Sequence, residues 1–469
     1  MSSAAAQLPA GRGTGRLRLA VQYALLAGPL LSMLDSSIVN VAVAPIARQL
    51  HASLPVVQWA VSGYLLALGT GLAATAYLSR RFGTLPVYRV SIVAFTLASA
   101  ACAAAPGVRL LLAARIVQGL VAAPLVPLAM SMLFGGSDAS RSMPATAGML
   151  LFLGPALGPS VGGALIGAVG WRSIFLINVP LGLGAAYAAG RIPPEMAAGR
   201  AARARLDWPG LLLLAAGLGL LLLGISQAPA SGWASAAVLL LLTSGAVLLA
   251  GYAATAGRAE QPALDLELAR SLAGALALTL CAAASVVTFA AVFLLPVFIQ
   301  DVQGHSALAA GLAMLPQGVI TGLSTTLGQR ILRLVTVRTT VTAGFAVLTI
   351  ASLGLLLITS TTPLAATSVL LAARSAAIGL VITPLLAVLT EPLRRCELND
   401  ASTLFSIWQR IAGSLGIGLI AAVFAQQSAA HGPVAALHVV GVIIAAIAAA
   451  GLVAAPLLPA RRNVAVYSG

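Results

Sequence analysis

LAGALALTLCAAASVVTFAAVFLLPVFIQ, residues 272–300, runs for 29 positions without a charged side chain. About 20 apolar residues suffice for an α-helix to cross a bilayer, so this stretch predicts a long membrane span that is tilted or kinked. The whole chain has the same character, because 60% of its 469 residues are hydrophobic and only 8% are charged. A soluble domain carries about 25% charged residues, which excludes a soluble enzyme. Roughly 280 apolar residues, at about 20 per span, set a scale of around fourteen helices.

Further hydrophobic runs, separated by short polar segments, predict an all-α polytopic membrane protein. We place its fourteen spans at 19–43, 56–78, 86–104, 108–132, 142–168, 172–190, 208–227, 234–255, 272–300, 308–329, 337–358, 364–389, 402–424 and 436–458.

An internal repeat groups these spans into two halves. The sequence LAAR at 112–115 recurs at 371–374, an offset of 259, and the same offset places Gly154 on Gly413. Parallel six-span halves are typical of one large class of transporters. We therefore predict an N-terminal tail (1–18), a six-helix half (19–190), a linker with two extra spans (191–271), a second six-helix half (272–458) and a C-terminal tail (459–469).

The charge distribution predicts the orientation in the membrane. All 26 basic residues are arginine, and with both termini cytoplasmic only Arg48, Arg109 and Arg172 fall in outer segments. Arginine enrichment on the inner side follows the positive-inside rule, so we expect a multi-pass protein of the plasma (inner) membrane with both termini cytoplasmic. The positive-inside rule also explains the net charge of +15. We therefore expect no nucleic-acid partner.

Several functions are disfavoured by missing motifs. Cys102, Cys281 and Cys396 are far apart without CxxC spacing, and the four histidines are scattered, so we expect neither a disulfide framework nor a metal site. The chain has no GxxxxGK[ST] phosphate loop, which excludes an ATP-driven pump.

One acidic residue, Asp35 in the first span, lies inside the predicted bilayer region. Arg115 of the fourth span falls at a similar depth, about 20–24 Å from the inner face at 1.5 Å per residue. Intramembrane charges are costly and tend to be functional. The pair is thus either a proton-exchanging carboxylate with its counter-charge or a static ion pair that joins two helices.

The fifth span contains GPALGPSVGG, residues 154–163. Its glycines, four residues apart, allow close helix contact, and its two prolines bend the helix. This pattern suits both tight packing and a hinge. In the second half, Arg374 and Arg410 lie within spans without an acid of their own, and backbone carbonyls, Asp35 or a substrate are their candidate partners.

Together these motifs resemble the major facilitator superfamily, and more closely its fourteen-span drug:proton antiporter family. The resemblance extends from about residue 30 to 420 and is specific for family and export, not for substrate. The matching segments are LDSSIVNVA (34–42), VQWAVSGYLLA (57–67), RIVQG (115–119), GPALGPSVGG (154–163), WRSIFLINVPLG (171–182), LDWPG (206–210), LLPVFIQDVQGHSALAAGLAMLP (294–316) and NDASTLFSIWQRIAGSLGIGL (399–419).

The resemblance implies two six-helix halves around a central cavity that opens alternately to each side. It assigns proton coupling to Asp35 and Arg115. It assigns control of the helix interface to the antiporter motif, Gly154, Gly158, Pro159, Gly162 and Gly163. In the loop after the second span the chain departs from the family: Arg81 and Gly83 remain, but Arg80 replaces an acid, so the inner gate is expected to close differently.

We therefore predict a transporter, not an enzyme, that exports small amphipathic molecules in exchange for protons. The proton gradient drives it without a cofactor, and we expect a monomer in the lipid bilayer. A specific self-resistance or metabolite exporter, a proton-coupled importer and a receptor or scaffold without flux are the alternatives. Candidate residues for the substrate cavity are Tyr64, Gln118, Phe289, Phe293, Phe405, Trp408 and Arg410.

Overall fold

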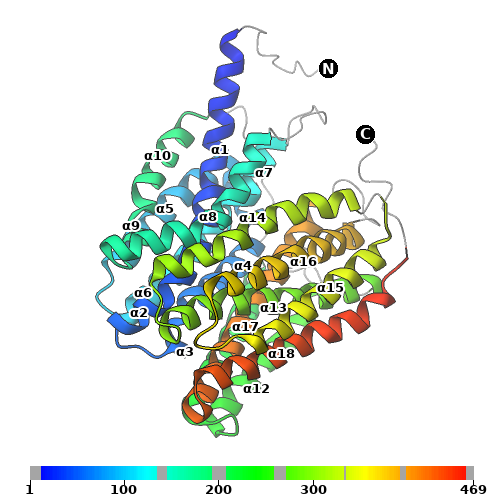
Figure 1. Cartoon of the computed structure of the whole chain (residues 1–469). Helices are drawn as coiled ribbons and strands as arrows, with labels where there is room; N and C mark the ends of the chain where they lie inside the picture. Colours follow the sequence, from blue (N-terminus) through cyan, green and yellow to red (C-terminus); the bar gives the residue numbers. More distant parts are fainter. Residues whose placement is uncertain are drawn as a thin grey trace.

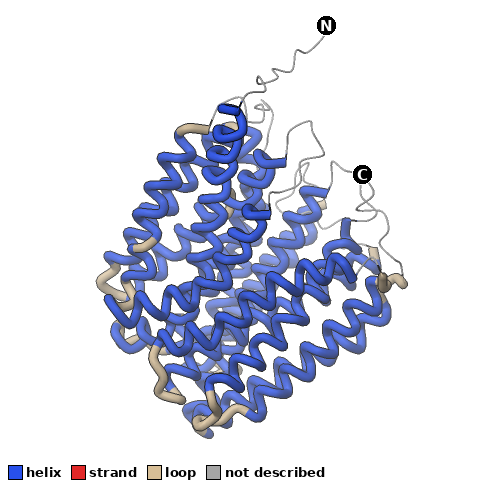
Figure 2. Tube along the Cα trace, turned by 45° about the horizontal axis from the view of Figure 1, so that its top comes forward, coloured by secondary structure: helices blue, strands red, loops and turns tan. Residues whose placement is uncertain are grey.

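The computed structural model describes residues 12–134, 145–192, 207–257, 271–331, 334–390 and 398–460. Every regular element in these ranges is helical (Figure 2). The first six spans are formed by α1 (Arg12–Ile38) with η1 (Val39–Ala42) and α2 (Val43–Gln49), α3 (Leu54–Val57) with α4 (Trp59–Phe82), α5 (Thr84–Ala104), α6 (Val108–Ala122) with α7 (Leu125–Phe134), α8 (Ala145–Val169), and α9 (Ser173–Leu176) with α10 (Asn178–Gly190). Two further spans are α11 (Trp208–Ser231) and α12 (Ala236–Ala256). The last six are α13 (Leu272–Asp301), α14 (Ala307–Ile331), α15 (Val337–Leu353) with η4 (Gly354–Leu357), α16 (Leu364–Thr390), α17 (Leu398–His431), and α18 (Pro433–Ala454) with η5 (Ala455–Leu457).

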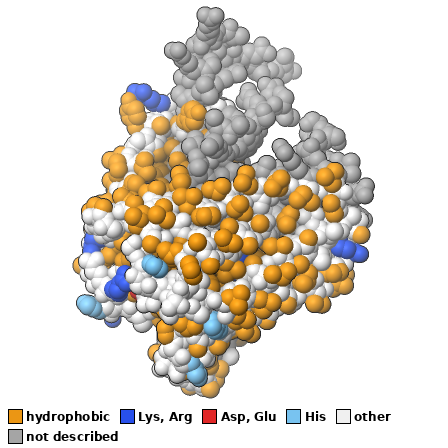
Figure 3. All heavy atoms as spheres, viewed as in Figure 1, with side chains coloured by type: hydrophobic (Ala, Val, Ile, Leu, Met, Phe, Trp, Pro, Cys, Tyr) orange, Lys and Arg blue, Asp and Glu red, His pale blue; other side chains and the backbone are white. Residues whose placement is uncertain are grey.

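These fourteen helical segments confirm the predicted polytopic fold. Thirteen are long and apolar enough to cross a membrane, and α8 supplies the fourteenth, with the shorter apolar stretch Leu157–Val169. Apolar side chains cover much of the face seen in Figure 3. Across the described part of the chain, exposed apolar side chains include Leu357 and Val369, with exposed fractions of 80% and 69%. Such a surface is stable only against lipid.

The span ends follow local capping chemistry more than hydropathy. The side chains of Asp207, Ser235 and Ser271 accept hydrogen bonds from backbone N–H groups in the first turns of α11, α12 and α13. The thirteenth span was predicted at 402–424, but α17 extends over Leu398–His431. It ends only before Gly432, whose φ of +85° is a conformation that glycine adopts without strain.

The two halves contain similar contacts at the ends of their last spans, although the two arginines involved are not related by the offset of the predicted repeat. Arg89 of the third span donates to the Ala189 carbonyl oxygen at the end of the sixth, at 2.9 Å. Arg338 of the eleventh span donates to the Leu458 carbonyl oxygen beyond the fourteenth, at 2.8 Å. Each arginine thereby stabilises the carboxyl end of the last span in its own half.

Two helix pairs join the halves: α8 packs against α14, and α4 against α17 (Figure 1). α11 packs against both α4 and α17, whereas α12 packs mainly on α11. At the α8–α14 contact, Gly163 leaves no room for a side chain against the Ala307 carbonyl, and Gly311 leaves none against that of Pro159. Close backbone contact of this kind is typical of small residues between membrane helices.

Further contacts between the halves lie at the ends of the spans opposite to the start of α1 and the end of α18, which we call the far end. Arg48 at the end of α2 forms an ion pair with Asp301 at the end of α13, at 2.9 Å. Next to it, the Gln300 amide donates to the Val41 carbonyl oxygen at 3.0 Å. The halves are therefore in direct contact at the far end.

Candidate functional site

The Asp35 carboxylate is fully buried and accepts three hydrogen bonds from two other helical segments. Arg115 Nη1 lies 2.6 Å from Oδ2, whereas Asn178 Nδ2 and Gln118 Nε2 lie 2.8 and 3.2 Å from Oδ1. The exposed fraction of Asp35 is 0%. Charge-assisted bonds of this kind are short and strong, so they hold α1, α6 and α10 together at this carboxylate.

The Arg115 guanidinium is equally well satisfied. Its Nε donates to the Ala60 carbonyl oxygen at 2.8 Å, and Nη1 also contacts Gln118 Oε1 at 2.8 Å. Its Cζ lies 4.1 Å from the centre of the Tyr64 ring, a cation–π distance. The structure thus brings together four of the predicted site residues: Asp35, Arg115, Gln118 and Tyr64.

Asn178 is a site residue that the sequence analysis missed. It is the first residue of α10, and its amide donates both to Asp35 and to Ser99 Oγ, the latter at 3.0 Å. The Ser99 hydroxyl in turn donates to the Phe175 carbonyl oxygen at 3.0 Å. Asn178 lies inside the motif WRSIFLINVPLG, and its polarity within an apolar span was the available signal.

The glycines of the fifth span pack against the helix that carries Asp35. Gly158 leaves no room for a side chain against the Ser37 hydroxyl, and Gly162 leaves none against Ile38. On the same helix, Ser160 Oγ donates to the Gly311 carbonyl oxygen of α14 at 3.0 Å. α8 therefore contacts the Asp35 segment on one face and the second half on another. Gly154 lies in α8, but its surroundings are outside the described residues.

The remaining cavity candidates lie in the second half. Phe293 and Phe405 are buried, with exposed fractions of 0% and 3%. Trp408 Nε1 donates to the Leu278 carbonyl oxygen at 2.9 Å, and Phe289 packs against Gly413. Arg410 is partly exposed and lies at the α4–α17 contact, where its Cβ is 3.5 Å from the position of a β-carbon on Gly69.

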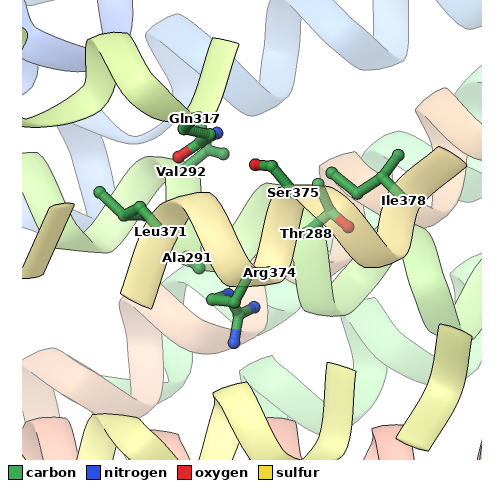
Figure 4. Close-up of a pocket in the computed structure, with 8 residues that line it drawn as sticks. All are labelled: Thr288, Ala291, Val292, Gln317, Leu371, Arg374, Ser375 and Ile378. Carbon is green, nitrogen blue, oxygen red and sulfur yellow. The ribbon is translucent and has the colours of Figure 1, made fainter. Parts of the chain in front are cut away.

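Arg374, the repeat counterpart of Arg115, is held by neutral groups. Nη1 donates to Ser352 Oγ at 2.8 Å and Nη2 to the Val287 carbonyl oxygen at 2.7 Å. It borders a small cavity, but in Figure 4 its guanidinium points away from Gln317 and Ser375. These contacts fix Arg374 within its own half.

The predicted inner-gate residues lie where the second span ends. Arg80 and Arg81 are exposed in the last turn of α4, and Gly83 follows with a φ of +93°. The acidic residues between the twelfth and thirteenth spans are candidate partners for these arginines, but Glu391, Glu397 and the side chain of Asp400 lie outside the described residues.

The fold and this buried polar cluster define a class: a helical membrane transporter with two joined halves and an intramembrane carboxylate. The family model of the Major Facilitator Superfamily matches residues 25–417. The chain belongs to this superfamily, whose members are transporters and not enzymes.

Its relatives include proteins named for multidrug resistance, antibiotic resistance or export. It is 32% identical over 405 residues to the multidrug resistance protein B homolog of Mycobacterium tuberculosis, covering 85% of this chain and 74% of the relative. It is 29% identical over 427 residues to the methylenomycin A resistance protein of Streptomyces coelicolor, covering 90% and 89%. It is 31% identical over 303 residues to the multidrug export protein EmrB of Escherichia coli, covering 63% and 58%.

Solved structures agree on the fold alone. A D-xylose–proton symporter has a TM-score of 0.64 at 15% identity, covering 94% of this chain and 98% of its own. A peptide transporter has a TM-score of 0.68 at 13% identity, covering 93% and 94%.

Proposed function

We propose that the protein exports small amphipathic molecules in exchange for protons, by alternating access, with both termini on the cytoplasmic side of the plasma membrane. The observation that carries the proposal is the buried Asp35 carboxylate, held by donors from α6 and α10. A purely structural ion pair at this depth gives no advantage over apolar packing.

Protonation of Asp35 changes the balance between these helices. A neutral carboxyl accepts weaker hydrogen bonds and leaves the Arg115 charge uncompensated, which destabilises the observed arrangement. Because Ser37 and Ile38 pack against α8, and α8 packs against α14, movement at Asp35 reaches the other half. A proton thereby favours one arrangement of the halves over the other.

The proton gradient supplies enough free energy for this work. One proton moving down about 150 mV yields roughly 3.5 kcal/mol. At about 1.4 kcal/mol per decade, this sustains a substrate gradient of roughly 300-fold.

The test is Asp35→Asn in proteoliposomes, with substrate-induced pH change measured across cationic, neutral and anionic amphipathic compounds. We expect the variant to lose uphill, proton-driven export while it retains exchange of substrate down its gradient. Asp207→Asn is the matched control, because asparagine also caps a helix and this residue lies at the start of α11. Proton-driven export by Asp35→Asn at the parent rate contradicts the proposal.

The breadth of the substrate range is a separate question. Some relatives are named for multidrug resistance and others for resistance to a single antibiotic. A self-resistance exporter specific for one metabolite is therefore the narrower form of the same proposal, and the same compound panel distinguishes it by a single responding compound.

A further inference from the structure

We infer that Arg410 selects for an acidic group on the exported molecule, so that the preferred substrates are amphipathic anions. The inference rests on the proposed function, since it names the substrate class of the same transporter. It starts from a surplus of positive charge inside the membrane.

Three arginines lie within the described spans away from their ends, and two of them are satisfied by the protein. Arg115 is paired with Asp35, and Arg374 donates to a hydroxyl and a carbonyl oxygen. For Arg410, no hydrogen bond or ion pair joins the guanidinium to another of the described residues. Its charge is therefore the one that a ligand can neutralise.

Arg410 also lies deep within its span, at the contact between the two halves. It is the tenth residue of the span Ala401–His431, which places it about 14 Å along the helix at 1.5 Å per residue. It faces Gly69 of the other half, so it belongs to the contact between the halves. An arginine at this depth is strongly disfavoured in lipid, so its exposed part faces water between the halves.

Asp35 is not the counter-charge of Arg410 in this arrangement. Both carboxylate oxygens are occupied by Arg115, Gln118 and Asn178, and the residue has no exposed surface. Tyr64, which packs on the Arg115 guanidinium at 4.1 Å, also interacts electrostatically with Arg410. A negative group bound at Arg410 is therefore linked electrostatically to the residues around Asp35.

The neighbourhood fits an amphipathic anion. A guanidinium binds carboxylates and sulfonates through charge-assisted hydrogen bonds, and often through two at once. Beside Gly69, the apolar Ile411 side chain and the Ile407 backbone complete the contact. A lipophilic cation meets like-charge repulsion at the same place, which lowers its affinity.

The experiment compares two fluorescent probes with one aromatic skeleton: the anion 8-anilinonaphthalene-1-sulfonate and its uncharged analogue N-phenyl-1-naphthylamine. Binding is titrated to the full-length protein in phosphatidylcholine nanodiscs, without a proton gradient. The variants are Arg410→Gln and Arg410→Lys. The matched control is Arg109→Gln, because Arg109 is exposed at the start of α6, on the far-end side of the molecule. Asp35→Asn is titrated in parallel.

We expect Arg410→Gln to weaken binding of the sulfonate about tenfold and to leave the uncharged probe unchanged. Arg410→Lys should retain part of the preference for the sulfonate over the uncharged probe. Arg109→Gln should bind both probes like the parent. Equal loss of both probes in Arg410→Gln, an unchanged sulfonate affinity, or no sulfonate binding by the parent overturns the inference. Because binding is measured without a gradient, a sulfonate preference that persists in Asp35→Asn keeps this inference separate from proton coupling.

Discussion

Asn178 contributes the shortest hydrogen bond to Asp35 Oδ1, and its position couples α10 to the carboxylate. The bond joins α10 to this carboxylate without adding a charge of its own. α10 and α6 both hold α1 at the Asp35 carboxylate. The positions of three helices therefore depend on one side chain.

Asn178→Ala should slow proton-driven export about tenfold, because it removes the hydrogen bond that joins α10 to the Asp35 carboxylate. The measurement is the initial rate of export in proteoliposomes, normalised to protein abundance. A normalised rate equal to that of the parent assigns Asn178 a purely structural role.

Arg115→Ala should destabilise the protein by about 3–5 kcal/mol, because it leaves the buried Asp35 carboxylate without its counter-charge. The double variant Asp35→Asn with Arg115→Gln should recover part of this loss, since it removes both charges. Unfolding of the purified protein, followed by tryptophan fluorescence, measures both effects. Additive losses contradict a coupled ion pair.

At the scale of the helices, spans were predictable because lipid requires about 20 apolar residues for each of them. Interruptions within the spans were not predictable. The first span was predicted as one continuous helix over 19–43, but it contains the 3-10 helix η1 over Val39–Ala42. Span ends were equally hidden, since α17 continues through polar residues as far as Gly432. Hydropathy carries no information on helix capping.

The cluster around Asp35 was only partly predictable, because hydropathy does not show which helices pack together. Charges inside spans are visible in the sequence, so Asp35 and Arg115 were found. The contribution of Asn178 depends on the packing of α10 against α1 and α5, which no local pattern specifies.

Gly158→Leu should abolish export, because a side chain at this position collides with the Ser37 hydroxyl and separates α8 from the helix that carries Asp35. Gly167→Leu is the control on the same helix, since nothing lies within 4 Å of a β-carbon there. Export and membrane abundance are measured for both variants. Normal export by Gly158→Leu shows that this contact is dispensable.

At the scale of the whole molecule, the ion pair between Arg48 and Asp301 joins the halves at the far end. Its side chains are 59% and 37% exposed, so it contributes only about 0.2–1 kcal/mol. Such a contact biases an equilibrium between two arrangements without locking it.

Arg48→Glu should open the far end more often, because two acids then face each other. We expect the labelling rate of a cysteine placed at Ala44, which is buried in the same helix as Arg48, to rise about two- to fivefold in a chain without its native cysteines. Exchange of the charges, Arg48→Glu with Asp301→Arg, should return the rate toward the parent value. Identical labelling in all three proteins excludes a role for this pair in closure.

The position of α11 affects how a lipid-dissolved molecule can enter between the two halves. It makes the two boundaries between the halves different. Where α4 meets α17, α11 lies across both helices and separates their contact from the surrounding acyl chains. Where α8 meets α14, no helix from outside the two halves packs against both partners among the described residues. Among the described helices, a molecule dissolved in the bilayer therefore meets an unshielded boundary between the halves on one flank only, where Gly163 and Gly311 bring the two backbones together.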